Sequence, residues 1–165
     1  MDDTCKLRCM TSLYLLHGER ILLLYRQGSR VIADSWVGAA GGHFEPEELN
    51  DPRACVLREL REELSLTESD ICDLQMRYIT LRRTEKGIRQ NYYFFARLPG
   101  DEPPALSSNE GVLRWFFPDE LEGLEMPRSA RGVIDHYLSV GRHDHALRVG
   151  ITDGGGTQFT ELPVC

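Results

Sequence analysis

The stretch from Gly41 to Leu66 reads GGHFEPEELNDPRACVLRELREELSL, and it decides how the rest of the chain is interpreted. Glu59, Glu62 and Glu63 have a spacing that places three carboxylates on one side of a helix. Two glycines and a first acidic cluster precede them, namely Gly41, Gly42, Glu45, Glu47 and Glu48. Carboxylate oxygens concentrated on a rigid helix are the ligands that a hard divalent cation prefers. The stretch therefore predicts a site for such a cation.

The helix that carries these glutamates is predicted to have two distinct faces. Asn50 or Asp51 can cap it, Pro52 suits its first turn, and residues 53–64 contain no helix breaker. At about 100° per residue its leucines fall within an arc of about 60°, and the glutamates within about 100° on roughly the opposite side. The leucines are Leu57, Leu60 and Leu64. We expect the leucine face to be buried and the other face to offer the carboxylates.

An ordinary solvated helix laced with salt bridges is the structural alternative. Like charges three or four residues apart cost about 0.2–0.5 kcal/mol per pair, and Arg58 can relieve one of them because it lies one turn before Glu62. The glycine turn and the upstream Glu48 favour the metal site, because a surface helix needs neither. Since no Cys or His converges on the cluster, Mg²⁺ or Mn²⁺ is favoured over zinc.

Composition limits the class of protein. The chain has 165 residues, 41% of them hydrophobic and 27% charged, which is typical of a single soluble domain spanning residues 1–165. It has no apolar run long enough for a membrane span and no basic secretory start at Met1, so we expect a cytoplasmic protein without a membrane partner. The net charge of −7 argues against binding of polymeric nucleic acid. Five scattered cysteines without a CxxC pair predict neither a zinc site nor disulfides.

Hydrophobic patterning predicts an α+β fold. Strands are expected at residues 7–16, 20–26, 71–83, 91–98, 112–117, 147–152 and 157–162, and helices at residues 53–64 and 128–140. Turns are expected at residues 17–19 and 84–90, and a polar loop at residues 27–34. Because strands outnumber helices, a mixed sheet packed by two or so helices is the expected architecture.

The opening stretch resembles the Nudix box, G-x5-E-x7-R-E-U-x-E-E-x-G-U, in which U is a bulky aliphatic residue. The matching residues are Gly42, Glu48, Arg58, Glu59, Leu60, Glu62, Glu63 and Leu66. Nine residues rather than seven separate Glu48 from Arg58, which leaves Glu45 and Glu47 as alternatives to Glu48. Ser65 replaces the glycine after the glutamate pair, which predicts a strained turn at the end of the helix. The resemblance also covers the strand with Arg26 and the run WFFPDEL at residues 115–121.

This resemblance implies an α/β/α sandwich around a mixed sheet, the Nudix fold, and hydrolysis of a nucleoside diphosphate linked to some group X. It implies that Glu59, Glu62 and Glu63 bind Mg²⁺ with help from the carbonyl of Gly42, and that Mn²⁺ could replace Mg²⁺. Attack by water on a phosphorus of the diphosphate would follow.

The resemblance assigns roles to three further residues. Arg58 would hold the loop against the helix, and Arg26 would contact a substrate phosphate. Glu110 resembles a loop glutamate that serves some members as an extra ligand or as the base, so Glu59 and Glu110 are rival candidates for the general base. The expected catalytic set is thus Arg58, Glu59, Glu62, Glu63 and Glu110.

Within this family the chain is most similar to MutT-type members. Their small-molecule substrates are nucleoside triphosphates, including oxidised ones such as 8-oxo-dGTP, which yield a nucleoside monophosphate and pyrophosphate. Hydrolysis of ADP-ribose or of a nucleotide sugar is the second enzymatic hypothesis. A non-catalytic nucleotide-binding Nudix module is the third, although such modules usually lose the glutamates that this chain keeps. The expected assembly is a monomer or a homodimer.

Other chemistry-bearing residues have plainer interpretations. His143-Asp144-His145 is expected in a surface loop, and residues 154–156 in a hairpin turn without a phosphate role. A basic cluster could meet phosphates but is favoured as a solvated hairpin tip, and it consists of Arg82, Arg83, Lys86 and Arg89. Three aromatic residues could stack on a base but are favoured as core, namely Tyr14, Trp36 and Phe44.

Overall fold

A computed structural model describes residues 6–28 and 34–165. The strands are β1 Leu7–His17, β2 Arg20–Arg26, β3 Ser35–Gly38, β4 Cys72–Thr84, β5 Gly87–Arg97, β6 Val112–Phe116, β7 Arg148–Asp153 and β8 Gly156–Glu161. The helices are α1 Pro52–Leu64 and α2 Arg128–Ser139. The acidic start at residues 1–3, on which the expected cytoplasmic location depends, and most of the predicted polar loop lie outside the described residues.

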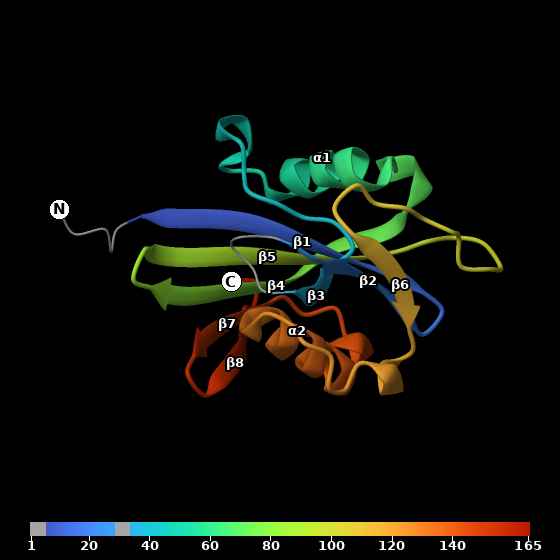
Figure 1. Ribbon diagram of the computed structural model, residues 1–165. Helices are drawn as coiled ribbons and strands as arrows, with labels where there is room; N and C mark the ends of the chain where they lie inside the picture. The colour runs from blue at the N-terminus through green and yellow to red at the C-terminus, as the bar shows by residue number, and fades with distance from the viewer. Residues whose placement is uncertain (1–5, 29–33) are drawn as a thin grey trace.

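The described strands form one mixed sheet in the order β3-β2-β1-β5-β4-β7-β8, and β6 also pairs with β2. Two of the strand pairs, β1 with β5 and β4 with β7, are parallel, and the others are antiparallel. Helix α1 covers one face of the sheet and α2 the other (Figure 1). The predicted α+β class and α/β/α sandwich are therefore confirmed.

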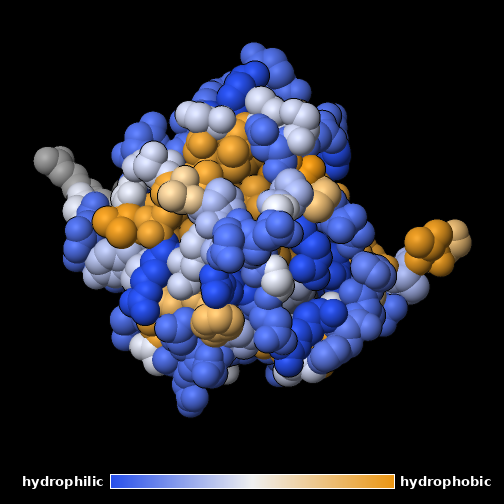
Figure 2. All heavy atoms as spheres, turned by 90° about the vertical axis from the view of Figure 1, so that its right-hand side faces the viewer, coloured by the Kyte–Doolittle hydropathy of each residue, from blue (hydrophilic) through white to orange (hydrophobic). Residues whose placement is uncertain are grey.

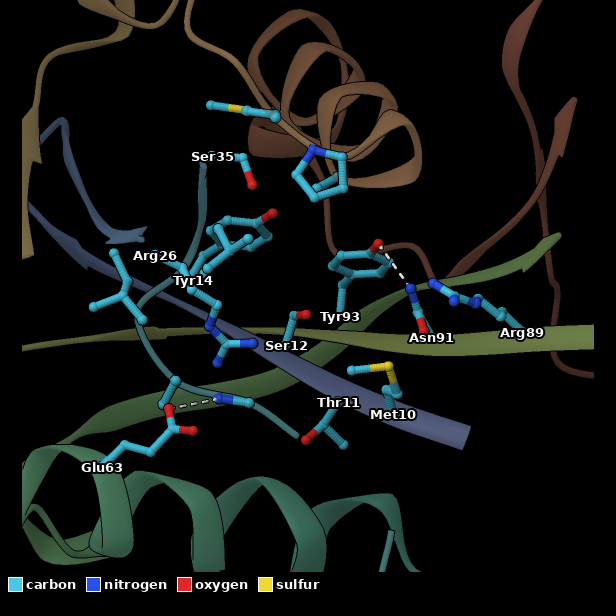
Figure 3. A pocket seen from close by; sticks show the side chains of 18 of the residues that line it. Met10, Thr11, Ser12, Tyr14, Arg26, Ser35, Glu63, Arg89, Asn91 and Tyr93 are labelled. Carbon is cyan, nitrogen blue, oxygen red and sulfur yellow. Dashed lines mark hydrogen bonds between the residues drawn. The ribbon is translucent and has the colours of Figure 1, made fainter. Parts of the chain in front are cut away.

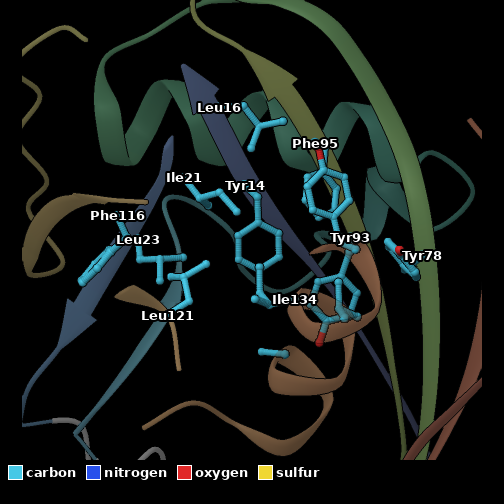
Figure 4. Packing of buried hydrophobic residues seen from close by; sticks show 13 residues of the cluster. Tyr14, Leu16, Ile21, Leu23, Tyr78, Tyr93, Phe95, Phe116, Leu121 and Ile134 are labelled. Carbon is cyan, nitrogen blue, oxygen red and sulfur yellow. The ribbon is translucent and has the colours of Figure 1, made fainter. Parts of the chain in front are cut away.

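Alternation along the central strands fills a separate core on each face of the sheet. On β1, Leu13 and Leu15 pack toward α1, whereas Tyr14 and Leu16 pack toward α2. The core on the α2 side gathers buried aromatic rings from β1, β4, β5 and β6 against Ile134 of that helix (Figure 4). Because side chains on a strand point alternately to opposite faces, one apolar strand serves both layers.

Three hairpin turns were predicted from polar punctuation, and the bounds of one of them are wrong. The β1–β2 turn is confirmed, with Gly18 at φ 58°. The predicted turn at residues 84–90 is too long, because β4 runs to Thr84 and β5 begins at Gly87. The residues at this end of the hairpin are mostly charged or polar, so their sequence shows no alternation of apolar and polar residues. Backbone pairing between β4 and β5, rather than hydrophobic burial, extends the two strands here.

Helix α1 begins and ends as its sequence predicts. Asp51, rather than Asn50, is the cap: its side chain accepts a 3.0 Å hydrogen bond from the backbone N–H of Ala54. Ser65 ends the helix in the left-handed region at φ 56°, the strained geometry expected where a glycine is replaced. The expected separation of faces is only partly correct, because Glu59 is 8% exposed and lies with the buried side chains.

The remaining secondary features follow the sequence. Residues 154–156 turn the β7–β8 hairpin as predicted. Asp144 is held by Arg77 and Arg148, so its carboxylate serves an ion-pair network. In the described ranges, no helix is long and apolar enough to cross a membrane. The face in Figure 2 is largely hydrophilic, with hydrophobic atoms confined to smaller areas.

Candidate active site

Arg58 connects the loop before α1 to the carboxylates of the helix. Its Nε donates to Glu48 Oε1 at 2.6 Å, and its Nη1 donates to Glu59 at 2.8 Å and to Glu62 at 3.0 Å. Its Nη2 donates to the carbonyl of His43 at 3.0 Å. The hydrogen bond from Arg58 is the main cause that lowers the pKa of Glu48, and the reciprocal bond raises the pKa of Arg58. These are the contacts that the expected holding role requires.

Glu48, rather than Glu45 or Glu47, is the upstream glutamate that accepts hydrogen bonds from Arg58, despite the two extra residues between them. The short 3-10 turn Pro46–Glu48 brings its side chain to Arg58, where it is 9% exposed. Glu45 lies 3.8 Å from Arg58 and is 55% exposed, and no contact of Glu47 with Arg58 is found in this part of the described chain. The insertion is therefore accommodated before the helix.

Gly42 lets the loop approach the helix closely. A Cβ atom at this position would overlap the carboxylate of Glu59, with the Oε1, Cδ and Oε2 atoms all near it. Glu59 is buried, and its Oε1 also accepts from Arg58. A glycine is thus required for Glu59 to keep its place beside the loop.

Glu63 lies at the centre of a negatively charged cluster. Its Oε2 accepts a 3.2 Å hydrogen bond from the backbone N–H of Gly41. Burial, with smaller contributions from the charges of Glu59 and Glu110, raises the pKa of Glu63 to about 8. A carboxylate in this setting holds a proton near neutral pH unless a positive charge replaces that proton.

Glu110 reaches this cluster from the loop before β6. Its Oε2 lies 3.7 Å from Nη2 of Arg26, at the end of β2. A Cβ atom on the next residue, Gly111, would overlap the carbonyl oxygen of Tyr25, so the loop packs directly on β2. The structure thus brings together two residues that lie far apart in the sequence.

Glu62 is placed differently from the other two helix glutamates. Its side chain is 51% exposed and its Oε2 is held by Arg58. The sequence predicted three carboxylates on one side of the helix, but the structure shows one buried beside the loop, one facing the sheet and one at the solvent edge. The three carboxylates differ in burial because each has different neighbours, which the helical spacing alone does not reveal.

The donor set fits a magnesium-type cation. In the described part of the chain, no three Cys, His, Asp or Glu side chains enclose a common point. Mg²⁺ needs no such cage, because it keeps several waters and binds through one or two carboxylates plus substrate phosphates. The clustered charge that raises the pKa of Glu63 is the charge such an ion would neutralise. Glu59, Glu63 and the loop at Gly42 are suited to hold it, with Glu62 at the edge.

A cavity of about 350 Å³ opens beside Glu63, between the sheet and the start of α2. Its walls include Ser12 and Tyr14 of β1, Asn91 and Tyr93 of β5, and residues 125–127 before the helix. Figure 3 shows Glu63 and Arg26 toward one end of this pocket and Asn91 with Arg89 toward the other. The cavity is within the size range of small-molecule sites.

Unpaired polar atoms are concentrated in this pocket. Four buried side-chain atoms of the described residues have no hydrogen-bond partner: Tyr14 OH, Arg26 Nε, Ser35 Oγ and Asn91 Oδ1. All four residues line the same cavity. Because buried polar groups are nearly always paired, their shared location indicates a site for a polar ligand.

Sequence reasoning found the acidic side of the site but missed most of the pocket. Ser12, Ser35 and Asn91 had a weak signal, namely polar residues at strand positions that face a core. Of the three aromatic candidates, Trp36 packs on Phe116 with ring centroids 4.8 Å apart, and Phe44 packs on Tyr92 at 5.4 Å. Only Tyr14 of these three lines the pocket.

Residues 9–137 match the NUDIX domain, so the chain belongs to the NUDIX domain family. The family supports a hydrolase that acts on pyrophosphate bonds of nucleotide-linked substrates and generally uses a divalent metal ion. A search of curated protein sequences gives no match.

Solved structures share the fold. The mutator MutT protein from Bacillus halodurans is 20% identical with a TM-score of 0.67, over 92% of this chain and 97% of that chain. The C. elegans Ap4A hydrolase is 17% identical with a TM-score of 0.61, over 83% and 99%. The MutT protein from Methanosarcina mazei Go1 is 20% identical with a TM-score of 0.61, over 84% and 96%. At these identities the similarity concerns the fold.

Proposed function

We propose that this protein is a Mg²⁺-dependent nucleoside triphosphate pyrophosphohydrolase, with an oxidised nucleotide such as 8-oxo-dGTP among its substrates. The observation that carries the proposal is the position of the polar-lined cavity directly beside the clustered carboxylates. The cavity would hold the nucleoside part of the substrate, and the carboxylates would lie next to its phosphates. The products are a nucleoside monophosphate and pyrophosphate.

The metal platform in this proposal consists of Glu59, Glu62 and Glu63 with the carbonyl of Gly42. A divalent cation supplies neutralisation of phosphate charge when bound. Glu63 gives up its proton to bind it, which the pKa of about 8 makes feasible near neutral pH. Arg58 keeps Glu59 and the Gly42 loop in register through the hydrogen bonds described above.

Arg26 and Glu110 act on the substrate in this proposal. A water oxygen forms a new bond to phosphorus while the bridging P–O bond breaks, its electron pair staying on the leaving phosphate. Arg26 neutralises the charge that develops. Glu110 accepts the proton of the water: its contact with Arg26, at 3.7 Å, is longer than a hydrogen bond, whereas Glu59 Oε1 is occupied by Arg58 at 2.8 Å.

The unpaired atoms of the pocket support a purine with additional hydrogen-bonding groups. Relative to guanine, 8-oxoguanine carries an N–H at position 7 and an oxygen at position 8. Asn91 Oδ1 is an unpaired acceptor, and the hydroxyls of Tyr14 and Ser35 are unpaired donors. A site with buried polar groups discriminates strongly between ligands that do and do not satisfy them.

The proposal is tested by a substrate screen with Mg²⁺ that reads phosphate and pyrophosphate release. The screen contains nucleoside triphosphates with and without 8-oxo substitution, ADP-ribose, a nucleotide sugar and Ap4A. We expect pyrophosphate from triphosphates, fastest from the oxidised purine. Faster cleavage of ADP-ribose or Ap4A would overturn the substrate assignment, and nucleotide binding without any turnover would identify a non-catalytic module.

A further inference from the structure

Two arginines at the far end of the pocket have no carboxylate partner among residues 6–28 and 34–165. Arg82 on β4 and Arg89 on β5 are directly opposite each other in the strand register, and both are half-buried. Neither guanidinium makes a hydrogen bond or ion pair with any described residue, although the two backbones are paired in the sheet. The predicted solvated hairpin tip therefore describes Arg83 and Lys86, which are exposed, better than it describes these two.

This arrangement costs stability unless an anion is present. Like charges directly opposite on a sheet are destabilising. Elsewhere in the chain the well-buried arginines have carboxylates: Arg77 and Arg148 share Asp144, and Arg58 has Glu48. Within the described residues, Arg82 and Arg89 have no carboxylate partner, and both line the main pocket.

Three hollows meet at this pair. Arg82 and Arg89 line the main pocket, a hollow over the hairpin tip and a small recess toward Ser129 of α2. Figure 3 places Arg89 and Asn91 together, away from Glu63. Side chains at this junction can reach a ligand that occupies the main pocket.

The strand register fixes how far this end lies from the carboxylates. Gly41, which binds Glu63, packs against the backbone of Thr11, and Thr11 pairs with Tyr92 on β5. Arg89 is three residues before Tyr92, and at about 3.3 Å per residue this corresponds to about 10 Å along the strand. An anion at Arg89 is therefore a separate group from the diphosphate beside Glu63.

We propose that Arg82 and Arg89 bind a second phosphate on the ribose of the substrate, so that nucleotides with a 2′- or 3′-phosphate are preferred over those without one. This inference rests on the proposed function in placing a nucleotide in the pocket. The two guanidiniums form charge-assisted hydrogen bonds with the phosphate oxygens, and the phosphate removes the repulsion between them.

The test measures binding by calorimetry in EDTA, which separates recognition from turnover. The ligands are AMP, adenosine 3′,5′-bisphosphate and adenosine 2′,5′-bisphosphate, with GMP and guanosine 3′,5′-bisphosphate as a second pair. One bisphosphate should bind wild-type protein at least about 10-fold more tightly than its monophosphate. Arg82→Gln and Arg89→Gln should each remove most of that preference, with circular dichroism confirming the fold.

Arg83→Gln is the matched control, because it removes the same charge from the same ribbon at an exposed position opposite Ile88. It should keep the preference. Equal binding of mono- and bisphosphates to wild-type protein would overturn the proposal. Equal losses of affinity for the mono- and bisphosphate in Arg89→Gln would also overturn it, because Arg89 would then bind the 5′-phosphate that both ligands carry. A preference without any hydrolysis would refute the proposed activity and leave this subsite standing.

Discussion

Arg58 Nε lies 2.6 Å from Glu48 Oε1, and this pair fastens the loop before α1 to the helix with the clustered carboxylates. The two side chains are 14% and 9% exposed, and the buried Glu48 carboxylate depends on Arg58 for compensation of its charge. Fixing this loop also fixes Gly41 and Gly42, whose backbones face Glu63 and Glu59. The position of the metal platform thus depends on an ion pair that need not contact the substrate.

Replacing Arg58 tests this dependence. Arg58→Ala leaves Glu48 buried without its partner and should lower the free energy of unfolding by about 3 kcal/mol. Urea denaturation at pH 7 measures the change. The control is Arg53→Ala on the same helix, whose ion pair with Glu68 is exposed and should contribute about 0.5 kcal/mol. Similar losses in the two variants would contradict the buried role of Arg58.

Gly42→Ala tests the close approach of the loop to Glu59. The new methyl group overlaps the Glu59 carboxylate, which is buried and held by Arg58, so it should displace that carboxylate from the site. We expect Mn²⁺ affinity, measured by electron paramagnetic resonance, to fall about 10-fold or more with the fold retained. Gly154→Ala adds a methyl group where no atom lies within 4 Å and should bind Mn²⁺ as wild type does. Unchanged affinity in Gly42→Ala would place the ion elsewhere.

The raised pKa of Glu63 predicts how stability and metal binding change with pH. Its pKa is about 8 in the folded protein against 4.5 for a free side chain, so the folded state holds a proton that the unfolded state has released. Stability from this group is fully present below about pH 4.5 and is lost as pH rises through about 8. In EDTA, Glu63→Gln should therefore gain about 2 kcal/mol over wild type between pH 5 and pH 9, after allowance for solvent screening.

The raised pKa of Glu63 also predicts how metal affinity depends on pH. Mn²⁺ affinity of wild-type protein should increase with pH up to about 8, with release of a proton that calorimetry in buffers of different ionisation enthalpy detects. Glu85→Gln, on the exposed β4–β5 turn, should behave as wild type does in both experiments. A flat pH profile for both stability and Mn²⁺ affinity would show that Glu63 is charged throughout.

Glu110→Gln distinguishes the two candidates for the general base. If Glu110 accepts the proton, kcat should fall about 10²- to 10⁴-fold and the acidic limb of the pH–rate profile should change, while Mn²⁺ affinity changes little. If Glu59 is the base, Glu110→Gln should keep that limb and lose less than about 10-fold. Single-turnover kinetics with saturating Mg²⁺ gives the required rates.

Local rules predicted much of the fold. The capping residue, proline and leucine spacing of α1 act within a few residues of one another, and so does the β1–β2 turn at Gly18. The start of β5 at Gly87 was missed, because the residues from Gly87 to Gln90, Arg89 among them, show no hydrophobic strand pattern and are ordered by pairing with β4. Strand order was not predictable either, since the parallel pairs β1–β5 and β4–β7 join distant segments.

The candidate site divides in the same way. Glu59, Glu62 and Glu63 were found because helical spacing brings them together. The pairing of Arg26 with Glu110 and the pocket that contains Ser35 and Asn91 arise from contacts across the sheet. Such contacts depend on register, which the residues themselves do not encode locally.

The most direct test of the central claim compares Mg²⁺-dependent turnover of wild-type protein with that of Glu63→Gln on the best substrate of the screen. The variant keeps the size of the side chain and removes the charge that faces Gly41, so it should fold normally by circular dichroism. We expect Mg²⁺-dependent pyrophosphate release in wild type and a loss of about 10²-fold or more in the variant. Equal turnover in the two purified proteins would contradict the assignment of these carboxylates as the metal platform.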